Sequence, residues 1–115
     1  MSVEFRRWRV GRVTITRMVE IGPVPIPPET LFPSASADLV KSTDWLAPNF
    51  ATDSGEIMLN FQCFLVDTGA TKILVDTCVG EQKHLAVDIL DGLTTGFLDT
   101  LAQAGAGPDD IDIVL

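Results

Sequence analysis

The sequence has 115 residues, of which 46% are hydrophobic, and its formal net charge is −8 at pH 7. This length fits one domain or part of one, and the hydrophobic content excludes an intrinsically disordered chain. The sequence has no apolar run long enough for a membrane-spanning helix and no secretory signal at its start, so we expect a cytoplasmic protein without a membrane partner.

Residues 1–21 predict β-structure. Val13 and Ile15 alternate with polar residues, and Val10-Gly11 interrupts the alternation, which indicates either one bent strand or a hairpin of two strands. Five of the eight basic residues, all arginines, lie in the first seventeen positions, whereas the chain from Met18 onward carries three lysines against fifteen acids. Because an acidic body repels phosphate, we expect the arginines to pair with acidic neighbours in a sheet and not to bind nucleic acid.

Residues 22–56 form a long segment whose prolines oppose regular helix and internal strand, so we expect an irregular loop. Within it, residues 34–41 allow a helical turn that Ser36 would cap. Trp45 and Phe50 follow as two large aromatic residues. Two interpretations remain open: the rings anchor the loop to the core, which we favour slightly, or they line a substrate pocket.

Residues 59–80 predict a central β-hairpin. Apolar residues first alternate with polar ones and then form a continuous run, as in a strand that becomes buried on both faces. Gly69-Ala70 supplies a two-residue turn with glycine at the position that needs a positive φ. The turn fixes a register that places Asp67 opposite Lys72 and Leu65 opposite Leu74, and the opposite charges of the first pair support it.

Asp76 is the informative residue of this hairpin. The register places it on the face of Leu65 and Leu74, and a carboxylate at the end of an apolar strand needs donors or a cation to stay ionised. The hairpin alone favours a simple interpretation, in which Asp76 caps the following loop as an Asx-turn. Cys63 is expected to be a small core residue, and for Cys78 a packing role is favoured over a nucleophilic one, because a thiol without a paired histidine is weak evidence for catalysis.

The C-terminal third predicts a helix followed by a strand. Residues 81–92 are ambiguous, whereas Thr95 is a good cap for a helix with an apolar stripe at positions 97, 98 and 101 and a stop at Gly105. Residues 107–110 predict a turn and 111–115 a buried strand. The order of elements indicates an α/β or α+β fold with a layered core. Because the sequence ends inside an apolar strand, we expect the chain to be a fragment.

Several segments, in this order and spacing, resemble the metallo-β-lactamase-fold hydrolases, and within them the branch of N-acyl-homoserine lactonases and methyl-parathion-hydrolase-like enzymes. They are WLAPNF (45–50), FLVDTG (64–69), ILVDTCVG (73–80), the positions Phe97, Leu98, Leu101 and Gly105, and the strand 109–115. The resemblance implies that residues 1–115 are the N-terminal part of a single domain, the first half of an αββα sandwich that is truncated before the metal-binding motif.

The resemblance also implies a role for Asp76. It matches an aspartate that orients the metal-ligand loop through hydrogen bonds. The ligands themselves would come from a His-x-His-x-Asp-His motif after Leu115 and from later residues, none of which is present. The single histidine, His84, matches no ligand position and is expected in a surface loop.

For the intact parent, the resemblance implies two zinc ions and a metal-bound hydroxide that attacks a lactone or ester-type small-molecule substrate. Cys78 to Gly80 would lie near the pocket floor, and Trp45 or Phe50 would form an apolar wall. The chain alone holds no catalytic residue, and we expect it to bind zinc weakly or not at all and to be inactive. The alternative is a non-catalytic α/β interaction module that self-associates or binds a partner through an unfinished sheet edge at residues 111–115.

Overall fold

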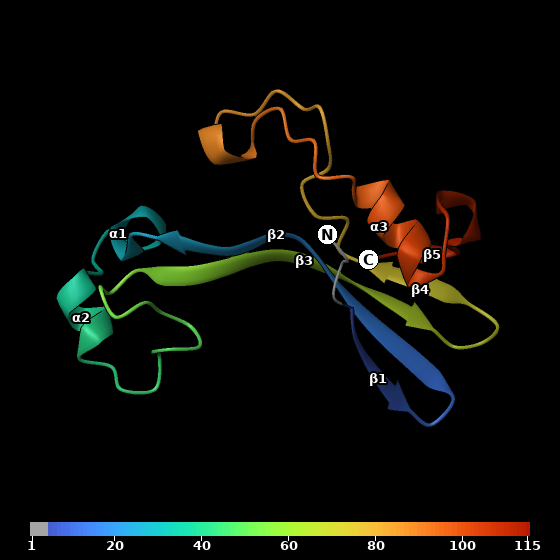
Figure 1. Cartoon of the computed structure of the whole chain (residues 1–115), viewed down its shortest axis with the longest axis horizontal. Coiled ribbons are helices and arrows are strands. Elements are labelled where there is room, and N and C mark those ends of the chain that lie inside the picture. The colour runs from blue at the N-terminus through green and yellow to red at the C-terminus, as the bar shows by residue number, and fades with distance from the viewer. Residues whose placement is uncertain (1–4) are drawn as a thin grey trace. The chain divides into compact units, whose positions relative to one another are not determined.

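The computed structural model describes residues 5–115, so the first four residues of the predicted β-structure lie outside the described residues. Its contacts divide the chain into two compact units: one combines the residues up to Glu20 with Phe61–Leu115, and the other is Ile21–Asn60. Figure 1 shows the elements. They are β1 (Arg6–Val10), β2 (Val13–Ile26), α1 (Pro28–Leu31), α2 (Ala37–Lys41), β3 (Ile57–Asp67), β4 (Lys72–Val75), α3 (Phe97–Ala104) and β5 (Ile113–Val114), with short 3-10 turns at Asp88–Leu90 and Pro108–Asp110.

The five strands form one sheet in the order β1-β2-β3-β4-β5. β1 and β2 are antiparallel and pair from Arg6↔Arg17 to Val10↔Val13, so the second of the two N-terminal alternatives, a hairpin, is confirmed. β3 and β4 are antiparallel as well, whereas β4 and β5 run parallel. The α/β fold class expected from the order of elements is therefore confirmed.

The central hairpin has the predicted register. Asp67 lies opposite Lys72, Leu65 opposite Leu74, and the carboxylate of Asp67 lies 3.5 Å from the ammonium group of Lys72. Gly69 has a φ of 88°, which the absence of a Cβ makes accessible. The backbone N–H of Thr68 donates to the carbonyl of Thr71 across the turn at 3.0 Å.

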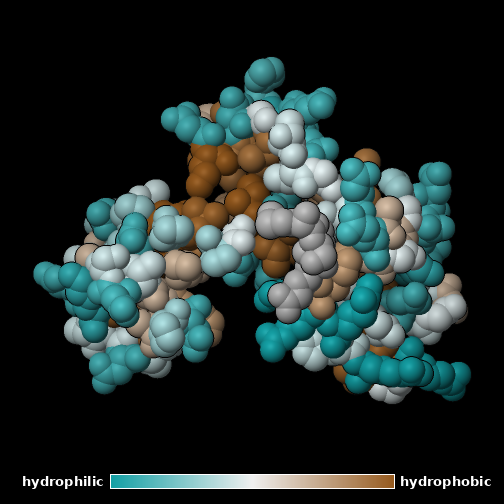
Figure 2. Space-filling view, viewed as in Figure 1, coloured by the Kyte–Doolittle hydropathy of each residue, from teal (hydrophilic) through white to brown (hydrophobic). Residues whose placement is uncertain are grey.

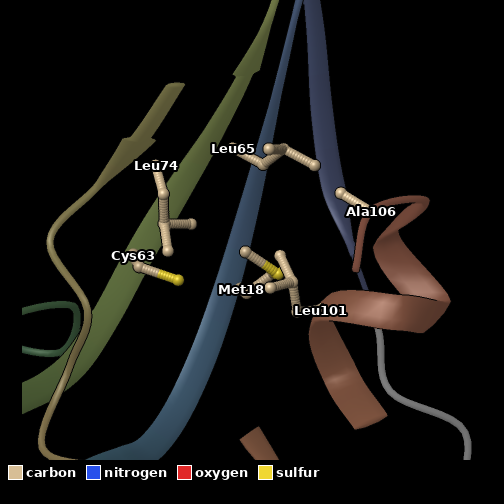
Figure 3. Close-up of a cluster of buried hydrophobic side chains, with 6 residues drawn as sticks. All are labelled: Met18, Cys63, Leu65, Leu74, Leu101 and Ala106. Atoms are coloured by element: carbon tan, nitrogen blue, oxygen red, sulfur yellow. The ribbon is translucent and has the colours of Figure 1, made fainter. Parts of the chain in front are cut away.

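One face of the sheet carries the core. Alternate residues of the strands point to this face and meet α3 and the turn that follows it, as Figure 3 shows. The buried apolar cluster consists of Met18, Cys63, Leu65, Leu74, Leu101 and Ala106. Burying a leucine of this kind contributes about 2 kcal/mol, so this cluster is the main stabilising feature of the unit that contains β4 and β5.

The predicted irregular segment 22–56 is partly regular. β2 continues through Pro23 and Pro25 to Ile26, so the expectation that these prolines prevent a strand is wrong. The two prolines occupy alternate positions, and their nitrogens, which have no hydrogen to donate, face the same side of the strand, where an edge tolerates them. The helical turn is confirmed as α2, with the Ser36 hydroxyl accepting a hydrogen bond from the N–H of Leu39 at 3.2 Å.

The start of α3 differs from the prediction. Gly96, not Thr95, is the residue before the first helical turn, and its N–H donates to the carboxylate of Glu81. The Thr95 hydroxyl is engaged elsewhere, with Glu20. The predicted stop at Gly105 is confirmed, because this residue has a φ of 108°.

The segment 81–92 after the hairpin, which the sequence leaves ambiguous, forms a long loop with one 3-10 turn. Its base is closed by two backbone hydrogen bonds, from Gln82 to Leu93 and from Gly92 to Lys83, each of 2.9 Å. Figure 2 shows apolar surface over this segment at the top of the view. The large apolar side chains exposed along this loop are Leu85, Val87 and Ile89.

β5 is shorter and more exposed than expected. Only Ile113 and Val114 form the strand, and these side chains are 44% and 58% exposed. The expectation of a buried strand is wrong, because β5 stands at the edge of the sheet with β4 as its neighbour.

The N-terminal arginines also depart from expectation. Within residues 5–115 the ion pairs involve Lys41, Lys72 and His84, so the expected arginine–carboxylate pairs are not formed there. Arg6 instead lies over the ring of Trp8, and Arg7 over that of Phe5. Among the described residues, no helix is long and apolar enough to span a membrane.

Candidate functional site

The candidate site lies where the parallel strands β4 and β5 end. The N–H of Leu115 donates to the carbonyl of Leu74, and the N–H of Asp76 donates to the carbonyl of Leu115. Asp76 therefore stands beside Leu115, the residue that follows β5, at the carboxyl edge of a parallel pair. In open α/β sheets this is the edge at which ligands bind.

Asp76 leaves the strand by a left-handed turn. Its φ is 65°, and its Oδ1 accepts a hydrogen bond of 2.7 Å from the N–H of Cys78. The Asx-turn interpretation is thus confirmed. The expectation that Asp76 shares the face of Leu65 and Leu74 is wrong, because β4 ends at Val75 and the carboxylate is exposed.

The loop that follows has unusual backbone geometry. Alternate residues adopt positive φ, and three of them, Asp76, Cys78 and Gln82, are not glycines. Left-handed backbone costs an ordinary residue about 1–2 kcal/mol, although aspartate tolerates it better than cysteine does. A loop that repeats this conformation has to be held by its surroundings.

Glu20 of β2 holds this loop. One carboxylate oxygen accepts from the N–H of Val79 at 2.8 Å, and the other accepts from the N–H of Gly80 at 3.0 Å and from the hydroxyl of Thr95 at 3.0 Å. Charge-assisted bonds of this kind are about twice as strong as neutral ones. Sequence reasoning missed Glu20, although one signal was present: it shares the buried face of β2 with Thr16 and Met18, where a carboxylate needs donors.

The two cysteines meet at the start of the loop. Cys63 is fully buried, as predicted, and Cys78 packs against the same apolar cluster. The hydrogen bond between the two thiols raises the pKa of Cys78, and burial raises it further; the same bond lowers the pKa of Cys63. Cys78 is therefore a protonated, packed thiol at neutral pH and a poor nucleophile.

Trp45 and Phe50 contact each other. Their ring centroids lie 6.2 Å apart in an edge-to-face arrangement, and the side chains are 70% and 56% exposed. The favoured interpretation, that they anchor the loop to the core, is wrong. Both residues belong to the unit Ile21–Asn60, whereas Cys78 and Gly80 belong to the other, so a pocket that unites the four stays a prediction.

The described residues do not fit a zinc centre. Within residues 5–115, no three His, Cys, Asp or Glu side chains are arranged to hold a metal ion. His84 is fully exposed, as predicted, with its Nδ1 3.9 Å from Asp91. One oxygen of Asp76 is engaged by the Cys78 N–H, and both thiols pack within the apolar cluster, so this donor set is committed within the protein.

Two solved structures are similar to this chain in fold. The first is AidC, a dizinc quorum-quenching lactonase in complex with a product, N-hexanoyl-L-homoserine; its TM-score is 0.66 at 24% sequence identity, and the match covers 97% of this chain and 35% of that chain. The second is AbOPH, a hydrolase in the beta lactamase superfamily, with a TM-score of 0.52 at 16% identity and coverage of 99% and 35%.

The chain has a partial metallo-β-lactamase-like α/β fold. The match covers 35% of each of the two solved chains, so this chain spans about a third of their length. At sequence identities of 24% and 16%, this similarity establishes the fold alone. Any activity has to be argued from the residues of the chain itself. No protein-family model and no curated protein matches the sequence.

Proposed function

We propose that this chain is the N-terminal part of a metal-dependent hydrolase that opens a lactone or related ester bond in a small-molecule substrate. The observation that carries the proposal is the position of Asp76, at the carboxyl end of β4 and beside the end of β5, within a partial metallo-β-lactamase-like fold. The description of AidC as a lactonase and of AbOPH as a hydrolase supports the same reaction class.

In this proposal Asp76 is a positioning residue. Its carboxylate fixes the Asp76–Gly80 loop through the Cys78 N–H, and its own N–H ties that loop to the carbonyl of Leu115, directly after β5. Because residues 5–115 supply no metal site, the ligands of the proposed zinc ions belong to other segments, and the 115-residue chain is proposed to be inactive by itself.

Hydrolysis of N-hexanoyl-L-homoserine lactone tests the proposal. The assay compares the 115-residue chain, with zinc supplied, with the complete product of the same gene. We expect no ring opening by the chain alone and zinc-dependent ring opening by the complete product. Turnover by the chain alone would contradict its proposed inactivity, and failure of both proteins on lactones and aryl esters would contradict the hydrolase function.

Variants of Asp76 in the complete product test its positioning role. Asp76→Ala removes the acceptor for the Cys78 N–H, and we expect kcat/KM to fall about 10–100-fold together with zinc retention. Asp76→Asn keeps an acceptor oxygen and tolerates the left-handed φ, so it should fold normally and show whether the charge is needed. Asp53→Ala, at an exposed acid in the other unit, is the matched control.

A second candidate function rests on the outer face of the sheet. Trp8, Ile15 and Phe64 share this face, the rings of Trp8 and Phe64 lie 6.5 Å apart, and none of the three side chains is buried. Exposed apolar surface of this kind is typical of an interface. The alternative is therefore an interaction module that self-associates through this face or through the edge strand β5.

A further inference from the structure

Cys63 and Cys78 are brought together by the hairpin and the loop that follows it. Phe64 lies opposite Val75 in the antiparallel ladder, so Cys63 lies beside the point at which β4 ends. Asp76 then turns the chain, with its carboxylate bonded to the N–H of Cys78. This turn returns Cys78 to the apolar cluster that contains Cys63, against which Cys78 packs.

We propose that Cys63 and Cys78 form a dithiol site that a peroxide converts into an intramolecular disulfide. Both cysteines are free, and they come from different segments, a strand and a strained loop. Cys78 packs against the cluster to which Cys63 belongs, so a rotation of the Cys78 side chain can bring the two sulfurs to bonding distance. The proposal requires neither a metal nor a substrate and is independent of the proposed hydrolase function.

The reaction balances with one molecule of hydrogen peroxide. Cys78 is the thiol that solvent reaches, because it is partly exposed and Cys63 is not. The Cys78 sulfur attacks one peroxide oxygen, the O–O bond breaks, and the released hydroxide takes up the thiol proton as water, which leaves a sulfenic acid. The Cys63 sulfur then attacks the Cys78 sulfur, the S–O bond breaks, and the second oxygen leaves as water with the Cys63 proton and the proton of the sulfenic acid.

The environment of Cys78 sets the rate of this reaction. Its pKa is raised by the bond with Cys63 and by burial, so the reactive thiolate is scarce at neutral pH. Oxidation should therefore be slow near pH 7 and faster at higher pH. Once the sulfenic acid forms, the contact with Cys63 favours the disulfide over further oxidation.

The test treats the 115-residue chain with hydrogen peroxide and then with N-ethylmaleimide under denaturing conditions. We expect both thiols to become unreactive together, with a mass loss of about 2 Da, one cross-linked peptide containing Cys63 and Cys78, and full recovery of both thiols after reduction. The product should run as a monomer on a non-reducing gel.

Three results would overturn the proposal: two alkylatable thiols after prolonged peroxide treatment, a sulfinic acid at Cys78 beside a free Cys63, or a disulfide between two chains. In the matched variant Cys63→Ala, peroxide should stop at a sulfenic acid on Cys78 that dimedone traps. If that variant fails to fold, the peptide map of the unmodified sequence still decides the question.

Discussion

At the scale of single residues, the side chain of Glu20 links three parts of the candidate site. Its carboxylate joins β2 to Val79 and Gly80 of the loop and to Thr95 before α3. Both oxygens are used, and the two loop amides would otherwise have no acceptor among these contacts. A buried or half-buried amide without an acceptor costs about 1–3 kcal/mol, so Glu20 contributes strongly to the geometry of the loop.

Glu20→Ala is expected to destabilise the chain by about 3 kcal/mol, because it removes all three hydrogen bonds at once. Glu20→Gln keeps one acceptor oxygen, so it should lower the free energy of unfolding by about half as much as Glu20→Ala. Urea unfolding followed by circular dichroism measures both changes. The control is Glu29→Ala at an exposed position of α1, and a loss for this variant equal to that of Glu20→Ala would contradict the assigned role.

Asp76 and Glu20 show what the sequence can reveal about such a site. Asp76 is recognisable because it follows an apolar strand directly and because the resemblance matches it, and its Asx-turn follows from local spacing. Glu20 could not be assigned partners from the sequence, since its donors lie 59 to 75 residues further along the chain. Its position on the buried face of β2 is the sequence signal for such a role.

At the scale of elements, the central hairpin is stabilised by the ionised form of Asp67. The N–H of Gly69 donates to this carboxylate at 2.8 Å and lowers the pKa below its ordinary value of 3.8, with a smaller contribution from Lys72. A carboxyl group with a lowered pKa in the folded chain stabilises that chain above its unfolded pKa. The stabilisation is lost as the pH falls through the pKa of the folded chain.

We therefore expect the carboxyl carbon signal of Asp67 to titrate with a midpoint below 3.8 in NMR spectra of the chain. The hairpin amides should become less protected from hydrogen exchange as the pH falls below this midpoint. In Asp67→Ala this acid-dependent loss should disappear. A midpoint at or above 3.8 would show that the Gly69 contact does not stabilise the charged form.

The end of α3 gives a second test at this scale. Gly105→Ala forces a Cβ onto a residue with a φ of 108°, and we expect a loss of about 1–2 kcal/mol in the free energy of unfolding. Gly107→Ala is the matched control, because Gly107 has a φ of −91° and its added Cβ would lie 3.5 Å from the carboxylate of Asp110, an ordinary contact. Equal losses for the two variants would contradict a conformational cause.

The elements with local signals were predictable, and those decided by distant contacts were not. The register of the hairpin follows from its turn, and α2 follows from the Ser36 cap. The sequence predicts Thr95 as the cap of α3, but the structure has Gly96 there, because the Thr95 hydroxyl donates a hydrogen bond to Glu20. The apolar residues of β5 predict a buried strand, whereas burial depends on what covers the sheet edge.

At the scale of the whole molecule, the two faces of the sheet differ. The inner face carries the buried cluster against α3, and the outer face presents apolar residues that are not buried. Proteins seldom expose a continuous apolar sheet face without a use for it. If the chain is part of a hydrolase, further segments of the same protein would cover this face. If it is an interaction module, another molecule would cover it.

The isolated 115-residue chain is therefore expected to self-associate with increasing concentration, as measured by sedimentation velocity. Trp8→Lys on the outer face should weaken the association about tenfold or more. Leu98→Lys is the matched control, because Leu98 is 55% exposed on α3, which covers the opposite face. A strictly monomeric chain, or equal effects of the two variants, would contradict an interface on the outer face.

The most direct test of the hydrolase role is to sequence the gene past the codon for Leu115. We predict a His-x-His-x-Asp-His motif within the next few codons, because Asp76 already stands beside the end of β5, where such ligands would follow. A stop codon directly after Leu115 would contradict the hydrolase proposal and leave the interaction module as the function that the fold supports.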